Sequence, residues 1–350
     1  MTKENTINWF IQEKYFLVVF LICILLAGGV TGFPAAAMWL GFAFAAYSAI
    51  SNDSIQTLGT FISSNLNRKW WVLWLYIGGI FLATMIWGWV SFDGDVSYGR
   101  LASKGFDEAP ASLTFLQVGA PLVLLLLTRL RMPVSTSILL LSCFATEASS
   151  ISRVLFKSVG GYAVAFVAAI ALWGTLGRWM NKKFVGTPHP GWYVAQFVTT
   201  GALWAVWLAQ DAANIAIFLP RSLNVTQLLA FLGFIFFGLG LLFYQRGEKI
   251  QEVVSEKKNV ADVRAAAVID LLYALILIYK LTVSTIPMST TWVFIGLLSG
   301  REIAMNWAVG DSLKSALKMA RRDLLVVAAG LLISLMVAAA VNPVLREAWL

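Results

Sequence analysis

Long apolar stretches, separated by short polar segments, follow one another along almost the whole chain. Each stretch is close to the roughly 20 mostly apolar residues that an α-helix needs to cross a lipid bilayer. The pattern therefore predicts an all-α polytopic membrane protein with about 11 transmembrane helices. The predicted spans cover residues 15–33, 36–65, 70–91, 112–130, 133–150, 153–177, 191–220, 228–245, 265–283, 287–304 and 324–341.

Two of these spans, 36–65 and 191–220, are longer and more polar than a plain membrane helix. The first contains Asn52-Asp53 and the second contains Gln210-Asp211. Irregular backbone at membrane depth is tolerated only where protein or a watery cavity surrounds it. The polar residues therefore predict a helix break near the middle of the membrane in each segment, and carboxylates at that depth indicate function.

The composition agrees with lipid rather than water around much of the chain. Apolar residues make up 59% of it and charged residues 13%, whereas soluble domains have about 45–50% and about 25%. So few charges cannot cover a water-facing surface, which excludes a soluble enzyme, a nucleic-acid-binding protein and a disordered chain. A single histidine, His189, and two cysteines also exclude a His/Cys metal site.

An intramembrane enzyme would therefore have to use a pair of aspartates, and the Gly-x-Gly-Asp pattern of such enzymes is missing. We expect neither an enzyme nor a bound cofactor. A channel would need a continuous polar path, whereas the polar residues of this chain cluster in two places, which favours an occluded transport site.

Charged loops orient the predicted spans. Lysine and arginine concentrate in residues 178–183, 246–264 and 314–322, whereas residues 92–111 are acidic. Because basic loops stay on the cytoplasmic side, the three basic segments are expected inside and the acidic one outside. This places the N-terminus in the cytoplasm and the C-terminus outside. The low charge and the lack of a targeting extension favour a bacterial inner membrane.

Two polar motifs occur twice and in the same order. Asn52-Asp53 is followed by Pro-Val-Ser-Thr-Ser at 133–137, and Gln210-Asp211 by Pro-Met-Ser-Thr-Thr at 287–291. The distances from Asp to Pro are 80 and 76 positions. One intervening loop is expected outside and the other inside, so the copies have inverted topology, as in many secondary transporters with broken or re-entrant helices at the midplane. The predicted domains are an N-terminal transmembrane helix at 1–34, inverted repeat 1 at 35–183, a linker at 184–190, inverted repeat 2 at 191–341 and a C-terminal tail at 342–350.

The two Pro-x-Ser-Thr motifs have the chemistry of an oxyanion site. Helix N-termini attract anions through unpaired N–H groups and the positive end of the helix dipole. Proline in a first helical turn, as expected at Pro133 and Pro287, marks such a start. The hydroxyls that follow add further donors. The predicted anion-binding residues are Asn52, Asp53, Ser135, Thr136, Ser137, Gln210, Asp211, Ser289, Thr290 and Thr291.

The two carboxylates would repel a bare anion, so a cation is expected between them and it. Carboxylates, amides and backbone carbonyls are suitable oxygen ligands for Na+. We therefore predict Na+ as the coupling ion, bound at Asp53 and Asp211; uptake of H+ by an aspartate is the alternative. The predicted cation-binding residues are Asn52, Asp53, Gln56, Thr60, Gln210, Asp211 and Asn214.

These motifs resemble those of the inorganic phosphate transporter (PiT) family. Residues 52–60, Asn-Asp-Ser-Ile-Gln-Thr-Leu-Gly-Thr, are similar to its Asn-Asp-Val-Ala-Asn-Ala-x-Gly-Thr signature, and residues 210–214 resemble a second copy, with Gln210 in place of Asn. The resemblance covers about residues 36 to 341. It implies sodium-coupled symport of inorganic phosphate by alternating access, and a homodimer. Relatives of the family carry sulfate, so a sulfate or other tetrahedral oxyanion permease, coupled to Na+ or H+, is the alternative.

Four charged residues near the ends of predicted spans are candidates for a gate. Glu147 lies 14 positions after Pro133, and Arg301 lies 14 positions after Pro287. Such residues either form ion pairs that open and close with transport or simply end their helices in the membrane interface. The candidate gate residues are Glu147, Arg153, Arg301 and Glu302.

Overall fold

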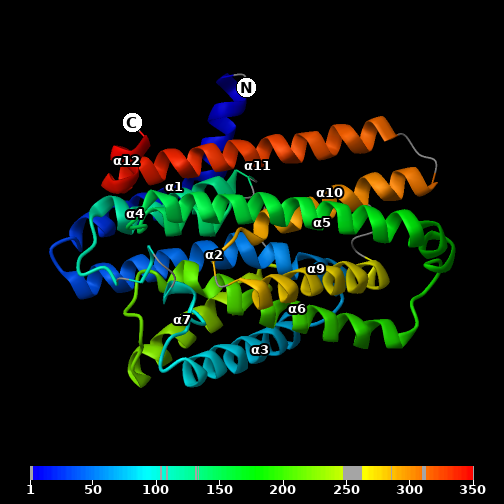
Figure 1. Cartoon of the computed structure of the whole chain (residues 1–350), viewed down its shortest axis with the longest axis horizontal. Helices are drawn as coiled ribbons and strands as arrows, with labels where there is room; N and C mark the ends of the chain where they lie inside the picture. The colour runs from blue at the N-terminus through cyan, green and yellow to red at the C-terminus, as the bar shows by residue number, and fades with distance from the viewer. Residues whose placement is uncertain are drawn as a thin grey trace.

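The computed structural model describes residues 3–102, 105–107, 109–130, 132, 134–246, 262–284, 286–309 and 313–349. Helices joined by turns make up this part of the chain, which contains no strand. In Figure 1 most helices run along the long axis of the molecule, with α11 near one edge and α3 at the opposite edge. The elements are α1 (Lys3–Gly29), α2 (Pro34–Ser64), α3 (Trp70–Ser91), η1 (Arg100–Ala102), α4 (Phe115–Arg129), η2 (Ser137–Leu141), α5 (Ala148–Lys183), α6 (Pro190–Ala216), α7 (Val225–Tyr244), α9 (Val263–Val283), α10 (Thr290–Val309), α11 (Leu313–Val341) and α12 (Pro343–Trp349).

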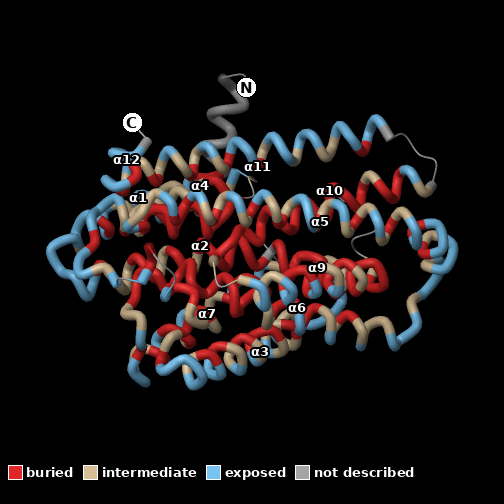
Figure 2. Tube along the Cα trace, in the orientation of Figure 1, coloured by how far each residue is buried: buried red, intermediate tan, exposed pale blue. Residues whose placement is uncertain are grey.

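Six of the described helices are long and apolar enough to cross a membrane. Large apolar side chains such as Phe156, Val167 and Leu332 are exposed on the outer helices, where lipid in place of water removes the cost of exposing them. Figure 2 shows this exposed outer layer around a buried centre formed by α2, α9 and α10. The predicted class, an all-α polytopic membrane protein, is confirmed. The six spans are Pro34–Ser54, Trp70–Ser91, Ala148–Lys183, Val225–Tyr244, Val263–Val283 and Lys314–Val341.

The sequence predicted about 11 spans of full length, and two features of the described chain account for much of the difference. The described residues 134–147 of the span predicted at 133–150 form only η2, a five-residue π-helical turn, followed by irregular chain up to the start of α5. α6 and α10 are long enough, but they carry polar and charged residues that other helices cover. Hydropathy alone therefore does not describe the interior of this protein.

α2 and α6 lie at the centre of the fold, and each is unbroken. In α2 every residue with a described side chain from Ser48 to Ile62 is buried, and in α6 the same is true from Trp207 to Ala216. The helix breaks predicted at residues 51–54 and 210–214 are therefore wrong. Protein surrounds these turns on all sides, so Asp53 and Asp211 find hydrogen-bond partners in neighbouring segments while the backbone keeps its own hydrogen bonds.

The chain is interrupted instead at the two Pro-x-Ser-Thr motifs. Irregular backbone is found at residues 134–135 before η2 and at residues 286–289 before α10. Pro133 lies outside the described residues. Pro287 precedes α10 by three residues and does not occupy its first turn. The helix starts later than predicted because Ser289 acts as its cap: the backbone N–H of Trp292 donates to Ser289 Oγ over 3.3 Å.

α5 and α10 pack backbone against backbone, because α10 presents two glycines one turn apart. A Cβ atom at Gly296 would lie 2.5 Å from the backbone oxygen of Tyr162, and one at Gly300 would lie 2.4 Å from that of Phe166. Small residues four positions apart allow this close approach in membrane helices, where packing rather than the hydrophobic effect holds helices together.

Replacing Gly296 by alanine is therefore expected to destabilise the protein by roughly 1–3 kcal/mol, since the opposing backbone cannot move aside cheaply. Gly160 on α5 is the matched control, because a Cβ atom at this residue would have nothing within 4 Å. Gly160→Ala should leave stability unchanged or raise it by up to about 1 kcal/mol through helix propensity. Thermal unfolding of both purified variants in detergent measures the difference, and equal melting temperatures would contradict the close packing.

Candidate functional site

Two buried aspartates from the central helices each accept a hydrogen bond from a threonine of an interrupted segment. Thr136 Oγ1, just before η2, donates to Asp53 Oδ2 of α2. Thr290 Oγ1, at the start of α10, donates to Asp211 Oδ2 of α6. Asp53 is 1% exposed and Asp211 is 4% exposed. The same carboxylate–hydroxyl contact therefore occurs once in each half of the chain.

The two interrupted segments also bond to each other in a reciprocal way. Ser137 Oγ donates to the backbone oxygen of Met288 over 3.2 Å, and Thr291 Oγ1 donates to that of Val134 over 3.2 Å. Val134 and Met288 are 154 positions apart, as are Ser137 and Thr291, so the two bonds are equivalent between the halves. The structure therefore places both Ser-Thr motifs and both aspartates around one centre.

Ser135 and Ser289 have a different part in this arrangement. Ser135 Oγ accepts the backbone N–H of Ile138 over 3.1 Å, and Ser289 Oγ accepts that of Trp292. Each serine thus caps the element that follows it. Both serines lie at the start of a helical element, η2 or α10, as the sequence predicted. Each hydroxyl oxygen already accepts a hydrogen bond from a backbone N–H.

The amide side chains around the first aspartate extend the cluster. Asn52 Nδ2 donates to Asp53 Oδ1 over 2.6 Å and to the backbone oxygen of Val134 over 2.7 Å. Gln56 Nε2 lies 3.4 Å from Asp53 Oδ1. The second half differs, because Gln210 Nε2 donates to the backbone oxygen of Leu277 in α9 over 3.2 Å.

Several buried oxygens of the cluster have no hydrogen-bond partner. They include the side-chain carbonyl oxygens of Asn52, Gln56 and Asn214 and the hydroxyl oxygens of Ser51 and Ser54. A buried polar atom without a partner costs free energy, and a small cation that binds oxygen would satisfy several of these atoms together. The described residues contain no group of three or more His, Cys, Asp or Glu side chains that could hold a metal, so such a cation would be held by amide, hydroxyl and carboxylate oxygens.

Thr60 does not belong to this cluster. Its Oγ1 donates to Asp270 Oδ1 of α9 over 2.7 Å, and Thr200 Oγ1 of α6 donates to Asp270 Oδ2. Asp270 is 1% exposed. The prediction that grouped Thr60 with Asp53 relied on their closeness in sequence, whereas seven residues along a helix separate them by about 10 Å.

Three residues that the sequence did not indicate complete the surroundings of Asp211. Trp207 Nε1 donates to Thr290 Oγ1 over 3.2 Å, and Tyr273 Oη donates to the backbone oxygen of Thr290 over 3.0 Å. Arg100, from the loop predicted to be extracellular, is 3% exposed and donates through Nε to the backbone oxygen of Ala209 over 3.0 Å. The sequence contains no motif that would indicate that Arg100, in a predicted loop, lies at an interior site.

Arg100 brings a positive charge close to the second aspartate. Burial lowers the pKa of Arg100 to about 10, while the nearby Asp211 carboxylate raises it. The guanidinium therefore stays charged at neutral pH. Its proximity gives Asp211 a fixed positive neighbour in the protein itself, which distinguishes the two halves of the site.

The space at the cluster is small. A cavity of about 30 Å³ adjoins Asp211, Ser54 and Trp207 and is otherwise lined by apolar side chains. A cavity of this volume has room for only about two water molecules, and Asp53, Thr136 and Thr290 do not line it.

The four candidate gate residues fall into two separate groups. Glu147 and Arg153 lie at the start of α5, whereas the Arg301 guanidinium lies 5.7 Å from the ring of Trp173, 20 positions further along α5 than Arg153. That separation is about 30 Å along the helix. Arg301 and Glu302 are 1% and 3% exposed, with Nη1 and Oε2 3.9 Å apart, so this pair lies inside the protein and does not end a helix in the interface.

Among solved structures, the chain is similar to one described as "The sodium-dependent phosphate transporter". The TM-score is 0.55 at 18% sequence identity, and the match covers 93% of this chain and 99% of the other. No family model matches the chain, and no curated protein matches it in sequence. The likeness therefore concerns the fold, which the two proteins share over nearly their whole length.

Because residues with unpartnered oxygens lie next to Asp53 and Asp211 along α2 and α6, Na+ is expected to stabilise the purified protein against heat relative to the same concentration of choline. The gain would be about 2.7 kcal/mol with Na+ at about 100 times its dissociation constant. Asp53→Asn and Asp211→Asn should each remove most of it. Asp270→Asn, which alters a buried carboxylate outside the cluster, should keep the Na+ response; a loss in all three variants would contradict this placement.

Proposed function

We propose that this protein is a secondary active transporter that takes up inorganic phosphate together with Na+. The observation that carries the proposal is the duplicated contact of Thr136 with Asp53 and of Thr290 with Asp211, joined by reciprocal bonds between the two motifs. A buried centre with hydroxyl donors, carboxylates and unpartnered oxygens fits an anion and a cation bound side by side. The fold shared with a sodium-dependent phosphate transporter supports the same function.

The anion would bind between the start of η2 and the start of α10. In this proposal Ser135, Thr136 and Ser137 face Ser289, Thr290 and Thr291 across the anion, and the hydroxyls of Ser137 and Thr291 exchange their backbone acceptors for its oxygens. Hydroxyls donate and accept hydrogen bonds, so they suit hydrogen phosphate, which carries a proton of its own. Sulfate offers acceptors only.

The cation would bind on the side of the central helices. Asp53 and Asp211 supply negative charge, and Asn52, Gln56 and Asn214 supply carbonyl oxygens that lack partners. Na+ at these residues neutralises the carboxylates and so removes their repulsion of the anion. Its loss after release of the anion restores that repulsion, which is how the two fluxes are coupled in this proposal.

Alternating access follows from the proposed inverted repeats, 35–183 and 191–341, which would move relative to each other about the bound ions. The protein acts in this proposal as a homodimer in the lipid bilayer of a bacterial inner membrane, with its N-terminus in the cytoplasm. It moves its substrate and does not transform it. The buried pair of Arg301 and Glu302 would help to close the transport pathway on one side of the membrane.

Uptake of labelled phosphate into proteoliposomes tests the proposal. An inward Na+ gradient is expected to drive accumulation, and choline in place of Na+ should reduce it to background. The double variant Thr136→Val and Thr290→Val removes both hydroxyl donors at nearly constant volume and should reduce uptake at least 100-fold, since two hydrogen bonds to charged groups are worth about 1.5–3 kcal/mol each.

The matched control carries Thr136→Ser and Thr290→Ser, which keeps both hydroxyls and should retain most of the uptake. Full transport by the valine variant would contradict the role of the threonines. Undiminished uptake in choline under an inward pH gradient would contradict coupling to Na+ in favour of H+. If sulfate competes more strongly than unlabelled phosphate, the substrate is sulfate and the proposal of a phosphate transporter is contradicted.

A further inference from the structure

α11 meets the membrane along most of its length. Its apolar span is Lys314–Val341, and only 22% of the most apolar 18-residue window in this span is buried inside the protein. From Leu324 to Val341 it carries 18 successive uncharged residues, which extend about 27 Å and so nearly match a hydrocarbon layer of about 30 Å. The turns before Leu324 therefore lie at the level of the lipid headgroups.

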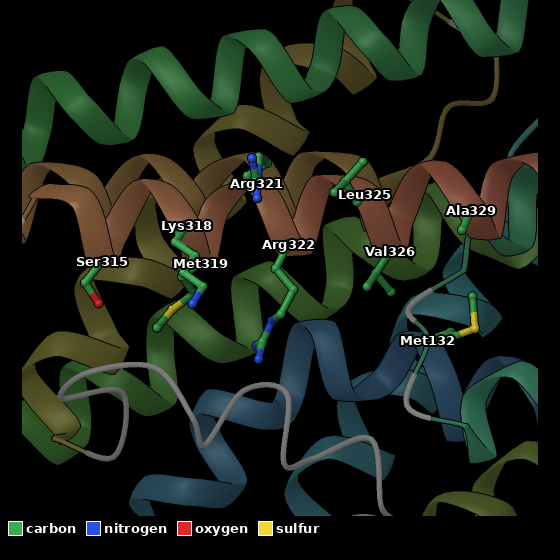
Figure 3. A pocket seen from close by; sticks show the side chains of 9 residues that line it. All are labelled: Met132, Ser315, Lys318, Met319, Arg321, Arg322, Leu325, Val326 and Ala329. Atoms are coloured by element: carbon green, nitrogen blue, oxygen red, sulfur yellow. The ribbon is translucent and has the colours of Figure 1, made fainter. Parts of the chain in front are cut away.

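A groove of about 600 Å³ lies between these turns and Met132. Lys318, Arg321 and Arg322 line its part nearer the start of α11. Figure 3 shows Lys318 and Arg322 projecting from one side of α11, and Met132 lying beyond them close to Ala329. The groove is thus basic at headgroup level and apolar towards the hydrocarbon.

The basic part of the groove has a surplus of positive charge. Asp323 Oδ1 lies 3.6 Å from Arg322 Nε, with the Arg322 side chain 61% exposed and the Asp323 side chain 11% exposed, so this carboxylate offsets one positive charge of the groove. Lys318 and Arg321 add two further positive charges in the same two turns.

We propose that this groove binds an anionic phospholipid, whose phosphate lies against Lys318, Arg321 and Arg322 and whose acyl chain lies along Leu325 and Ala329. Basic pockets between membrane helices recognise such headgroups. A free phosphate ion would use only the basic part, whereas a phospholipid matches both the charge and the apolar continuation. The inference rests on α11 and its surroundings, and it holds whatever the protein transports.

Native mass spectrometry of the full-length protein tests this inference with phosphatidylglycerol and phosphatidylcholine of identical acyl chains. Phosphatidylglycerol is expected to be retained at least ten-fold more strongly. The triple variant Lys318→Gln, Arg321→Gln and Arg322→Gln should lose this preference, since each removed charge weakens retention about five-fold. Lys314→Gln, an exposed basic residue of α11 outside the groove, is the matched control and should retain it.

A second variant tests the shape of the groove without changing its charge. Ala329→Trp fills the apolar part and should also weaken retention of phosphatidylglycerol, while excess inorganic phosphate should not displace the lipid. Equal retention of the two lipids, an unchanged preference in the triple variant or no effect of Ala329→Trp would each overturn the proposal. Displacement by inorganic phosphate would assign the groove to the free ion, and a change in oligomeric state alone would assign it to contact between copies.

Discussion

A carboxylate inside a membrane protein must be hydrogen-bonded and neutralised, and this requirement organises the centre of the fold. Asp53 and Asp211 lie in the stretches of α2 and α6 whose described side chains are all buried, and other segments of the protein supply a hydrogen-bond donor to each. Thr136 and Thr290 supply them from chain that is 83 and 79 positions away. Burying an unpaired polar group is costly, so these two contacts hold the interrupted segments against the central helices.

The donors and acceptors of the site are carried by different kinds of backbone. The carboxylates extend from unbroken helices, whereas the hydroxyls lie where the chain changes from irregular backbone to helix. The two halves are similar in this respect, but they are not identical. Asn52 bonds to the Pro-x-Ser-Thr motif of its own half while Gln210 bonds to α9, and Arg100 lies near Asp211.

Apolar stretches and duplicated motifs were sufficient to predict the all-α class and four residues that lie at the centre. Asp53, Thr136, Asp211 and Thr290 stand out in sequence because polar residues at membrane depth are rare. The breaks in α2 and α6 were predicted wrongly, because the sequence does not indicate that surrounding protein will satisfy polar side chains on a whole helix. Arg100 and the pairing of Thr60 with Asp270 depend on how loops and helices fold back, which spacing along the chain does not encode.

The continuity of α2 has a mechanical consequence. Asp53 and Thr60 lie on the same continuous helix, about 10 Å apart along its axis, and Thr60 donates a hydrogen bond to Asp270 of α9. A helix resists compression along its axis, so a shift of Asp53 would strain the contact of Thr60 with Asp270, about two turns further along α2. Asp53 and Asp270, which have no direct bond between them, would thereby be coupled mechanically through α2.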